Sequence, residues 1–324
     1  MLRWEKLGKL FDPRDLGGGC WMKEYAQSPS ALAYDGFVRV YFCSRPAPSA
    51  DGQYQSYMSW IDLDRADLRR VLRICPQPVL ELGGCGCFDE FGTYPVSVIR
   101  SGDEVRAYYA GWTRCESVPF NAAIGLAVSR DGGESFRRIG AGPVLSYAPD
   151  EPFLLGSPRV RRFSDTWYLW YVAGKEWLRT ESRPEPVYRI RMATSPDGIE
   201  WVRLGRDLIA PKLGAYECQA CPDVLFRDGR YHMFYSYREV SNYRGPEGGY
   251  RIGYACTDDL NSWTRRDEIA GMGVSPNGWD SEMVNYPHVF TLDSETWMIY
   301  QGNEMGRAGI GLARLVEPCD WSQL

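Results

Sequence analysis

The sequence has little of several features that mark particular protein classes. Its 324 residues include only two histidines, and no apolar run is long enough to cross a bilayer. Lys and Arg number 37 against 42 Asp and Glu, so the chain is a poor candidate for a basic nucleic-acid face. The first residues lack the apolar core of a signal peptide. We therefore expect a cytoplasmic protein with neither nucleic-acid nor membrane partners.

The ten cysteines do not form a convincing metal motif. In a cytoplasmic protein they are expected to be thiols rather than disulfides. The spacing of Cys85 and Cys87 is too tight for a zinc knuckle, and the pair of Cys218 and Cys221 has no matching second pair. We expect no structural metal and no cofactor. The one alternative is a hard cation such as Ca²⁺, which a cluster of carboxylates could hold.

Prolines recur at nearly even intervals, 63 to 66 residues apart, at Pro29, Pro95, Pro158, Pro222 and Pro287. After each proline come an alternating strand, a turn and a second, strongly aromatic strand. The turns include Asp35-Gly36 and Asp228-Gly229, a strong hairpin signal. Helical periodicity is lacking. The pattern predicts a single five-bladed β-propeller of four-stranded antiparallel blades over residues 1–324, with blades starting near 21, 88, 150, 216 and 279.

A pair of β-sandwiches is the alternative architecture, but it would not explain one pattern recurring five times at constant spacing. We expect residues 1–20 to supply a strand that closes the ring with the last unit, which would hide the sheet edges.

Acidic residues precede the prolines at equivalent places. Five positions before the proline, four of the five units have a glutamate, and two further aspartates lie nearby: Glu24, Glu90, Glu217, Glu282, Asp89 and Asp280. In a propeller these positions and the loops after the second strands open on one face. Those loops supply Arg45, Trp112, Lys175, Trp177, Arg238 and Asn303, and the positions after the prolines supply Arg159, Asp223 and His288. The pattern predicts a central cavity that binds a sugar through charged groups and indole rings.

Three short segments around the prolines carry a resemblance to known enzymes: Tyr216-Glu217-Cys218 with Pro222-Asp223-Val224, Ser157-Pro158-Arg159-Val160, and Gln27-Ser28-Pro29-Ser30. At these segments the chain resembles the five-bladed propeller glycoside hydrolases, the clan of families 32, 43, 68 and 130. The resemblance implies the propeller fold and a sugar ligand. It does not carry over a catalytic pair, because serine stands at positions 28 and 157 where the resembling enzymes have aspartate.

The chain also resembles a group of propeller proteins associated with polysaccharide biosynthesis. The segments concerned are Phe88-Asp89-Glu90-Phe91-Gly92, Tyr250 to Ala255, Gly278 to Met283, and Gly302-Asn303.

The leading hypothesis is a glycoside hydrolase or transglycosidase that acts on a sugar or oligosaccharide. Glu217 would be the general acid, and Glu90, Asp89, Asp280 or Glu282 would supply the base or nucleophile. An anionic or phosphorylated group would be held by Arg45, Arg159, Lys175 and Arg238, and the remaining candidates would bind the sugar. Two alternatives stay open: a non-catalytic glycan-binding propeller, and an enzyme of another reaction class that uses the same funnel.

Overall fold

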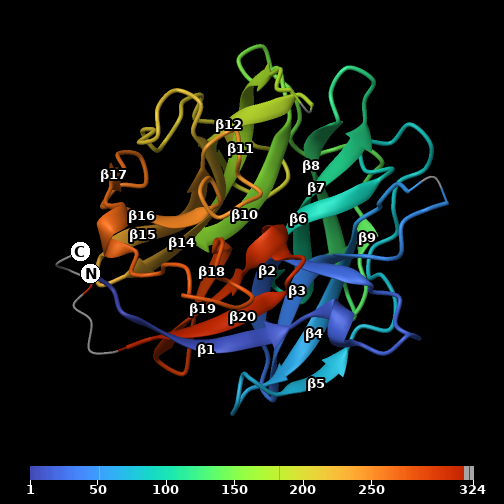
Figure 1. Cartoon of the computed structure of the whole chain (residues 1–324), viewed down its shortest axis with the longest axis vertical. Coiled ribbons are helices and arrows are strands. Elements are labelled where there is room, and N and C mark those ends of the chain that lie inside the picture. Colours follow the sequence, from blue (N-terminus) through green and yellow to red (C-terminus); the bar gives the residue numbers. More distant parts are fainter. Residues whose placement is uncertain (51, 182, 317–320, 322–324) are drawn as a thin grey trace.

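The computed structural model describes residues 1–50, 52–181, 183–316 and 321. Its strands form five four-stranded antiparallel sheets arranged in a ring, so the predicted five-bladed β-propeller is confirmed (Figure 1). Blade 1 consists of β2 (Glu24–Ala33), β3 (Phe37–Arg45), β4 (Tyr57–Asp64) and β5 (Val71–Ile74). Blade 2 consists of β6 (Gly92–Ser101), β7 (Glu104–Arg114), β8 (Phe120–Ser129) and β9 (Arg137–Arg138).

The next two blades repeat this order. Blade 3 consists of β10 (Leu155–Phe163), β11 (Thr166–Leu178), β12 (Glu185–Ser195) and β13 (Val202–Arg203). Blade 4 consists of β14 (Cys218–Arg227), β15 (Arg230–Arg238), β16 (Arg251–Thr257) and β17 (Thr264–Arg265). Helical segments of the described chain are short: η1 (Pro13–Asp15), η2 (Asp267–Ile269) and the four-residue turn α1 (Asn303–Gly306). Among the described residues no helix could span a bilayer.

Blade 5 is assembled from two distant parts of the chain. Its three inner strands are β18 (Asn285–Leu292), β19 (Glu295–Gln301) and β20 (Ile310–Leu315), and its outermost strand is β1 (Trp4–Phe11). The pairing of β1 with β20 runs from Trp4 opposite Leu315 to Phe11 opposite Ile310. The expected closing strand from residues 1–20 is therefore present, and the innermost strand β18 contacts β2 to complete the ring.

The hairpin between the two innermost strands of blade 4 shows why the turns could be predicted from the sequence. Asp228 and Gly229 have φ of 50° and 83°, the left-handed backbone that a two-residue hairpin turn requires. Gly229 adopts this region without a Cβ clash, and aspartate tolerates it better than most residues.

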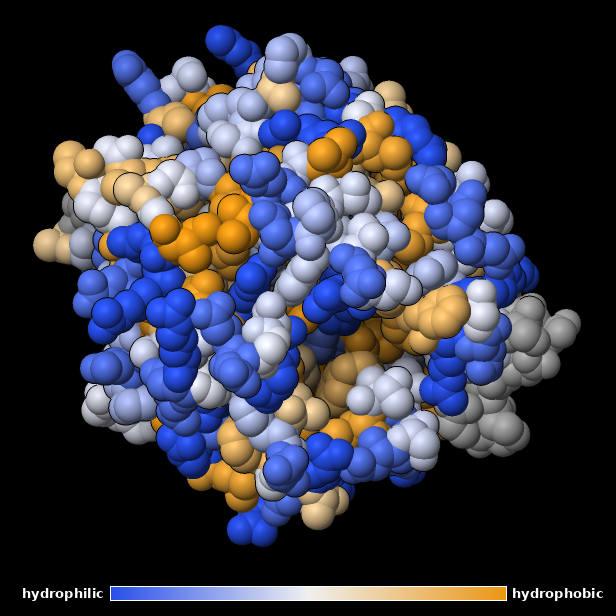
Figure 2. Space-filling model, turned by 180° about the vertical axis from the view of Figure 1, so that it is seen from behind, coloured by the Kyte–Doolittle hydropathy of each residue, from blue (hydrophilic) through white to orange (hydrophobic). Residues whose placement is uncertain are grey.

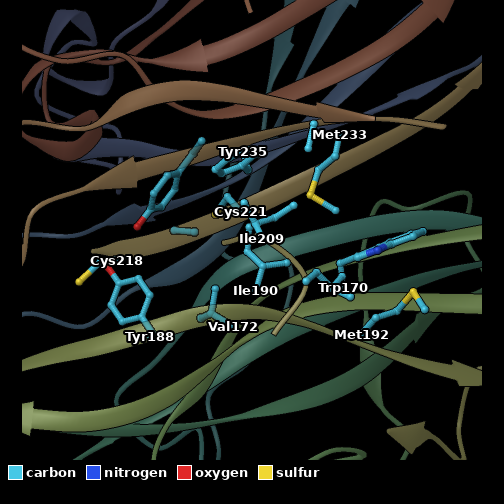
Figure 3. Close-up of a cluster of buried hydrophobic side chains, with 14 of the residues drawn as sticks. Trp170, Val172, Tyr188, Ile190, Met192, Ile209, Cys218, Cys221, Met233 and Tyr235 are labelled. Atoms are coloured by element: carbon cyan, nitrogen blue, oxygen red, sulfur yellow. The ribbon is translucent and has the colours of Figure 1, made fainter. Parts of the chain in front are cut away.

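The apolar core is divided among the spaces between blades. Five separate clusters of buried side chains each join mainly two neighbouring sheets. Figure 3 shows the cluster between blades 3 and 4, where Trp170 and Val172 from one sheet meet Met233 and Tyr235 from the next. Each sheet thus buries both faces, which fits the aromatic-rich alternation of the second strands.

Each innermost strand is distorted at the residue before its proline. Ser28, Ser157, Cys221 and Tyr286 have φ between 44° and 55°, and the strand register shifts at each of them. In blade 2 the register shifts at the same place, and the Tyr94–Pro95 peptide bond is cis. A bulge of this kind re-aims a side chain, so one residue from each blade is turned at an equivalent point of the inner strand.

Candidate functional site

A central cavity of about 630 Å³ is lined by residues from all five blades. Its aromatic lining consists of Tyr25, Tyr54, Tyr94, Trp112, Phe120, Tyr188 and Tyr286. Its cationic lining consists of Arg45, Arg114, Arg183 and Arg244. No aspartate or glutamate lines it within the part of the chain that the structure describes. In the view from behind, Figure 2 shows a hollow near the middle of the molecule with hydrophobic residues at its base.

The residues before the prolines form the floor of this cavity. Tyr94, Ser157 and Tyr286 line it directly, and the rings of Tyr94 and Tyr286 stack with centroids 6.2 Å apart. Ser28 and Cys221 meet beside them, with Oγ and Sγ 3.9 Å apart. Burial raises the pKa of the Cys221 thiol to about 11, so it is uncharged at neutral pH. The floor and the groups beside it are therefore hydroxyl, thiol and phenol groups rather than carboxylates among the described residues.

The wall formed by blades 1 and 2 has stacked aromatic and cationic groups. The Arg45 guanidinium lies 4.2 Å from the ring centroid of Tyr25 and 5.3 Å from that of Tyr54. The indole N–H of Trp112 donates to Ser56 Oγ at 2.8 Å, which fixes the orientation of the ring. Of the predicted binding residues, Arg45 and Trp112 line the cavity.

Two other predicted residues lie just behind the lining. Trp177 packs edge-on against Phe120, with ring centroids 5.6 Å apart. Glu24 accepts a hydrogen bond from the Tyr54 hydroxyl at 3.1 Å and forms an ion pair with Arg307 at 2.8 Å.

Three predicted binding residues do not line the cavity and are held by other groups of the protein. Lys175 is exposed and pairs with Asp207 at 3.3 Å. Arg238 is buried against Tyr243, 3.6 Å from its ring centroid, and Nη2 donates to the Tyr188 hydroxyl. The side-chain oxygen of Asn303 accepts from two backbone N–H groups, including that of Glu282 at 2.8 Å. Arg238 thus reaches the cavity only through Tyr188.

Two of the predicted catalytic acids, Asp89 and Asp280, belong to a link that recurs in several blades. In blade 2 the buried Asp89 accepts from the Tyr109 hydroxyl at 2.9 Å and pairs with Arg138 of the outermost strand at 3.3 Å. In blade 5 Asp280 accepts from Tyr300 at 3.0 Å and pairs with Lys6 of β1 at 2.7 Å. The acid connects the loop before the innermost strand to the second and fourth strands.

Blade 3 has the same link, through an acid that the glutamate spacing does not predict. Glu151 accepts from the Tyr171 hydroxyl at 2.7 Å and pairs with Arg203 of the outermost strand at 2.9 Å. The blade 3 proline is Pro158, and the unit that lacks a glutamate five positions before its proline has Phe153 there; Glu151 lies two residues earlier. The recurring feature is therefore a buried acid with a tyrosine and a basic partner.

In blade 4 Glu217 pairs with the basic residue of the outermost strand, whereas the tyrosine of the second strand, Tyr235, donates to Asp267 at 2.8 Å. The surroundings of Glu217 argue against the predicted general-acid role. Its carboxylate pairs with Arg265 at 2.8 Å and accepts from Gln219 at 2.8 Å and from the backbone N–H of Lys212 at 2.8 Å. Burial raises the pKa of this carboxyl, but the hydrogen bonds outweigh burial and bring the pKa below its ordinary value. A general acid needs the opposite shift.

The other two glutamates lie in loops away from the lining. Glu90 accepts from the backbone N–H of Gly86 at 2.9 Å, which ties its own loop together. The backbone of Glu282 donates to Asn303 and accepts from Arg251. The expected convergence of the acids on one cavity is therefore wrong for the described residues: none of the predicted acids lines the cavity, and the glutamates at equivalent spacing have different partners.

The residues after the prolines form a buried charged cluster beneath the floor. Asp223 is fully buried, and its carboxylate contacts Arg161, Arg159 Nε at 3.7 Å and His288 Nδ1 at 2.8 Å. Burial raises the pKa of Asp223, but the two guanidinium groups and His288 outweigh it and hold the pKa well below its usual range. Burial lowers the pKa of His288 to about 4 despite the nearby carboxylate. Arg159, Asp223 and His288 lie in contact with one another, but none of the three lines the cavity.

Metal ligands are not gathered in the described part of the chain. No group of three or more His, Cys, Asp or Glu side chains there could hold an ion, which leaves the Ca²⁺ alternative without a site among those residues. The described cysteines are free thiols.

The fold places the molecule among the five-bladed β-propellers. A solved structure titled glycoside hydrolase superposes with a TM-score of 0.76 at 16% identity, covering 98% of this chain and 93% of the other. The β-1,2-mannobiose phosphorylase from Listeria innocua gives a TM-score of 0.67 at 14% identity, covering 97% and 96%. At such identities the likeness shows the fold, and the resemblance seen in the sequence is confirmed at that level.

The particular family follows from sequence relatives. The chain is 34% identical over 316 residues to the uncharacterized protein Rv1502 of Mycobacterium tuberculosis strain H37Rv, covering 97% of this chain and 99% of the relative. It belongs to the same family as that protein. The 1,2-β-oligomannan phosphorylase of Thermoanaerobacter sp. strain X514 is 29% identical over 201 residues, 60% of this chain and 59% of the enzyme. No protein-family model matches the chain.

Proposed function

We propose that this protein is a carbohydrate-active enzyme that binds an oligosaccharide in the central cavity and processes its glycosidic linkage. The observation that carries the proposal is the lining of aromatic rings and guanidinium groups around about 630 Å³. That volume is large enough to hold a short oligosaccharide. Aromatic faces cover the apolar face of a sugar ring, and the arginines and hydroxyls match its oxygens. The named activity of the Thermoanaerobacter relative supports the same substrate class.

Binding and turnover should be measured separately. We would titrate the protein with β-1,2-mannobiose and other neutral disaccharides by calorimetry, and follow sugar release with and without inorganic phosphate. Trp112→Ala removes one aromatic wall and should weaken binding about 10- to 100-fold, the affinity equivalent of burying a large apolar side chain. The matched control is Tyr216→Ala, which removes an aromatic side chain that is 51% exposed and outside the cavity lining. Unchanged affinity in the Trp112 variant, or no saccharide bound by the wild type, would refute the proposal.

A non-catalytic glycan-binding propeller is the second candidate. It is favoured by the floor, where Ser28 and Ser157 stand and no carboxylate lines the cavity within the described residues. Two-carboxylate hydrolysis requires acids on both sides of the scissile bond. Saccharide binding without turnover across the panel, at protein concentrations that saturate the ligand, would establish this candidate. A cytoplasmic location and an involvement in polysaccharide biosynthesis remain predictions from the sequence.

A further inference from the structure

The cysteines that the structure describes differ in how accessible their sulfurs are. Five are buried, and burial raises the pKa of the thiols of Cys43, Cys75, Cys218 and Cys221. The thiolate is the reactive form of cysteine, so these groups are poor nucleophiles. Cys85 is exposed and Cys87 is half-buried, and only one residue separates them. This pair therefore combines access from solvent with a second sulfur nearby.

The loop between β5 and β6 folds the two cysteines into a tight turn. The backbone N–H of Cys87 donates to the carbonyl of Gly84 at 3.0 Å, which closes a four-residue turn. Gly86 is the third residue of this turn and has a φ of 82°, the value of a type II turn, which glycine adopts without a Cβ clash. The Glu90 carboxylate accepts from the backbone N–H of Gly86 at 2.9 Å and holds the turn in this shape.

The turn suits a bond between the two sulfurs. Disulfides join Cα atoms about 4.4 to 6.8 Å apart, and Cα atoms two positions apart in an extended strand lie near the upper limit, at about 6.6 Å. The compact backbone at Gly86 brings the Cα atoms of Cys85 and Cys87 closer together than in a strand. The strands β5 and β6 can therefore keep their places when the bond forms.

The two sulfurs differ in their surroundings, which sets the order in which they react. A Cβ added at Gly84 or Gly86 would meet nothing within 4 Å, so the outer side of the turn is open. A Cβ added at Gly83 would lie 2.5 Å from Cys87 Cβ, so Cys87 packs against the backbone of its own loop. An incoming molecule therefore meets Cys85 first, and Cys87 is the neighbour that reacts second.

We infer that Cys85 and Cys87 form a redox-active dithiol that is modified by exchange with a low-molecular-weight disulfide, R–S–S–R. The Cys85 thiol loses its proton and its sulfur attacks one sulfur of R–S–S–R, so that a mixed disulfide forms on Cys85 and R–S⁻ leaves and takes up the proton as R–SH. Cys87 then attacks the Cys85 sulfur in the same way, which forms the Cys85–Cys87 bond and releases the second R–SH. The dithiol is thus oxidised by two electrons while R–S–S–R is reduced to two thiols. An exposed disulfide in so short a ring is readily reduced again, so the modification is reversible.

The test equilibrates the whole chain with mixtures of glutathione and glutathione disulfide. Acid quenching, alkylation of the remaining thiols and mass spectrometry of the protein and its peptides then follow. In the more oxidising mixtures the wild type should lose two hydrogens, and the peptide with Cys85 and Cys87 should take up no alkylating agent. Cys87→Ser should instead stop at the mixed disulfide and carry about tenfold more glutathione on Cys85 than the wild type, because no second thiol displaces it. Cys20→Ser is the matched control and should behave as the wild type, since Cys20 is half-buried and its nearest cysteine in the sequence, Cys43, is buried.

Neither sulfur of the pair lines the central cavity, so this result does not depend on whether a saccharide binds there. A wild type that keeps both thiols in pure glutathione disulfide overturns the inference. Separate glutathione on each cysteine without a bond between them overturns it too, as does a Cys87→Ser protein with no more glutathione on Cys85 than the wild type. An oxidised form that runs as a covalent dimer in non-reducing electrophoresis shows bonds between chains and also overturns the bond within the turn.

Discussion

Replacing Asp223 by asparagine tests whether the charged cluster beneath the cavity holds the ring together. The carboxylate is fully buried and is the acid shared by Arg159, Arg161 and His288, with the backbone N–H of Val289 donating to it at 2.7 Å. An asparagine keeps one acceptor oxygen but turns an NH₂ group toward donors on the other side. It also leaves two guanidinium groups without their counter-charge.

Breaking a buried ion pair from one side typically costs about 3 to 5 kcal/mol. With an unfolding entropy of about 2 cal/mol/K per residue, a chain of 324 residues should lose about 4 to 7 °C in melting temperature. Thermal unfolding followed by circular dichroism, with urea titration as a second measure, checks the value. Asp165→Asn is the matched control, because that side chain is fully exposed and its pair with Arg162 should contribute little.

The same substitution has a pH signature. The folded-state pKa of Asp223 is depressed, so its stabilising contribution is complete above the unfolded pKa of about 4 and is lost as the pH falls toward the folded value. The gap between the wild type and the Asn variant should therefore be widest near pH 7 and narrow below pH 4. An Asn variant as stable as the wild type at pH 7 would refute the reasoning, since it would mean that the two guanidinium groups do not need this carboxylate.

Three further predictions concern the histidines, the blade links and the cavity wall. Burial lowers the pKa of both His232 and His288 to about 4, so the unfolded chain binds protons more readily than the folded protein does. The free energy of unfolding should therefore fall between pH 6.5 and pH 4, by about 1.4 kcal/mol per pH unit for each histidine. Urea midpoints measured across this pH range check the value. Glu217→Gln should lower the free energy of unfolding by about 1 to 3 kcal/mol, with saccharide affinity changed less than threefold in calorimetry. Gly92→Ala should weaken saccharide binding as Trp112→Ala does, because the added Cβ would collide with the Trp112 indole.

Each of these has a result that would count against it. A urea midpoint that does not change between pH 7.5 and pH 4.5 would contradict the burial of the neutral imidazoles. A Glu217→Gln protein of full stability but without turnover would restore the general-acid hypothesis. For the cavity wall, Gly84→Ala is the control, because an added Cβ there meets nothing within 4 Å, and equal affinity losses in both glycine variants would contradict the role of Trp112.

The architecture was predictable because its signals repeat. Proline cannot donate to a strand ladder, and the residue before it avoids helical backbone, so five evenly spaced prolines mark five equivalent strand positions. The structure adds what spacing does not specify, namely that Ser28, Ser157, Cys221 and Tyr286 take left-handed backbone at this point. Turn pairs such as Asp228-Gly229 could also be predicted, because few residue types tolerate the positive φ that the turn requires.

The direction of the acidic side chains was not predictable from spacing. A glutamate before an innermost strand can face the funnel or turn outward to a basic residue of the fourth strand, and sequence distance is the same in both cases. The discriminating signal was present in the chain, since Arg138, Arg203 and Arg265 occupy the outermost strands at repeating positions. Because the hypothesis considered the acids without their basic partners, it predicted a catalytic role for side chains that form ion pairs within the blades.

The cavity wall was only partly predictable. Arg45 and Trp112 lie near the ends of the second strands β3 and β7, and the repeat identified both as candidates. Tyr54 and Arg244 were missed because they lie in loops that follow no repeat, and Arg114 was missed although it is the last residue of the strand β7. The non-repeating loops hold much of what distinguishes one propeller's ligand from another's.

The pairing of β1 with β20 also constrains how the molecule is assembled during synthesis. β1 is made long before its partner, so its edge has to wait unpaired while four blades form, and such late, non-local closure is slow. An exposed strand edge invites association with other chains, which charged side chains oppose. Glu5, Lys6 and Lys9 supply that protection along β1. In the closed ring Lys6 pairs with the buried Asp280, so a lysine that charges the free edge of β1 also joins β1 to the loop before β18 in the finished ring.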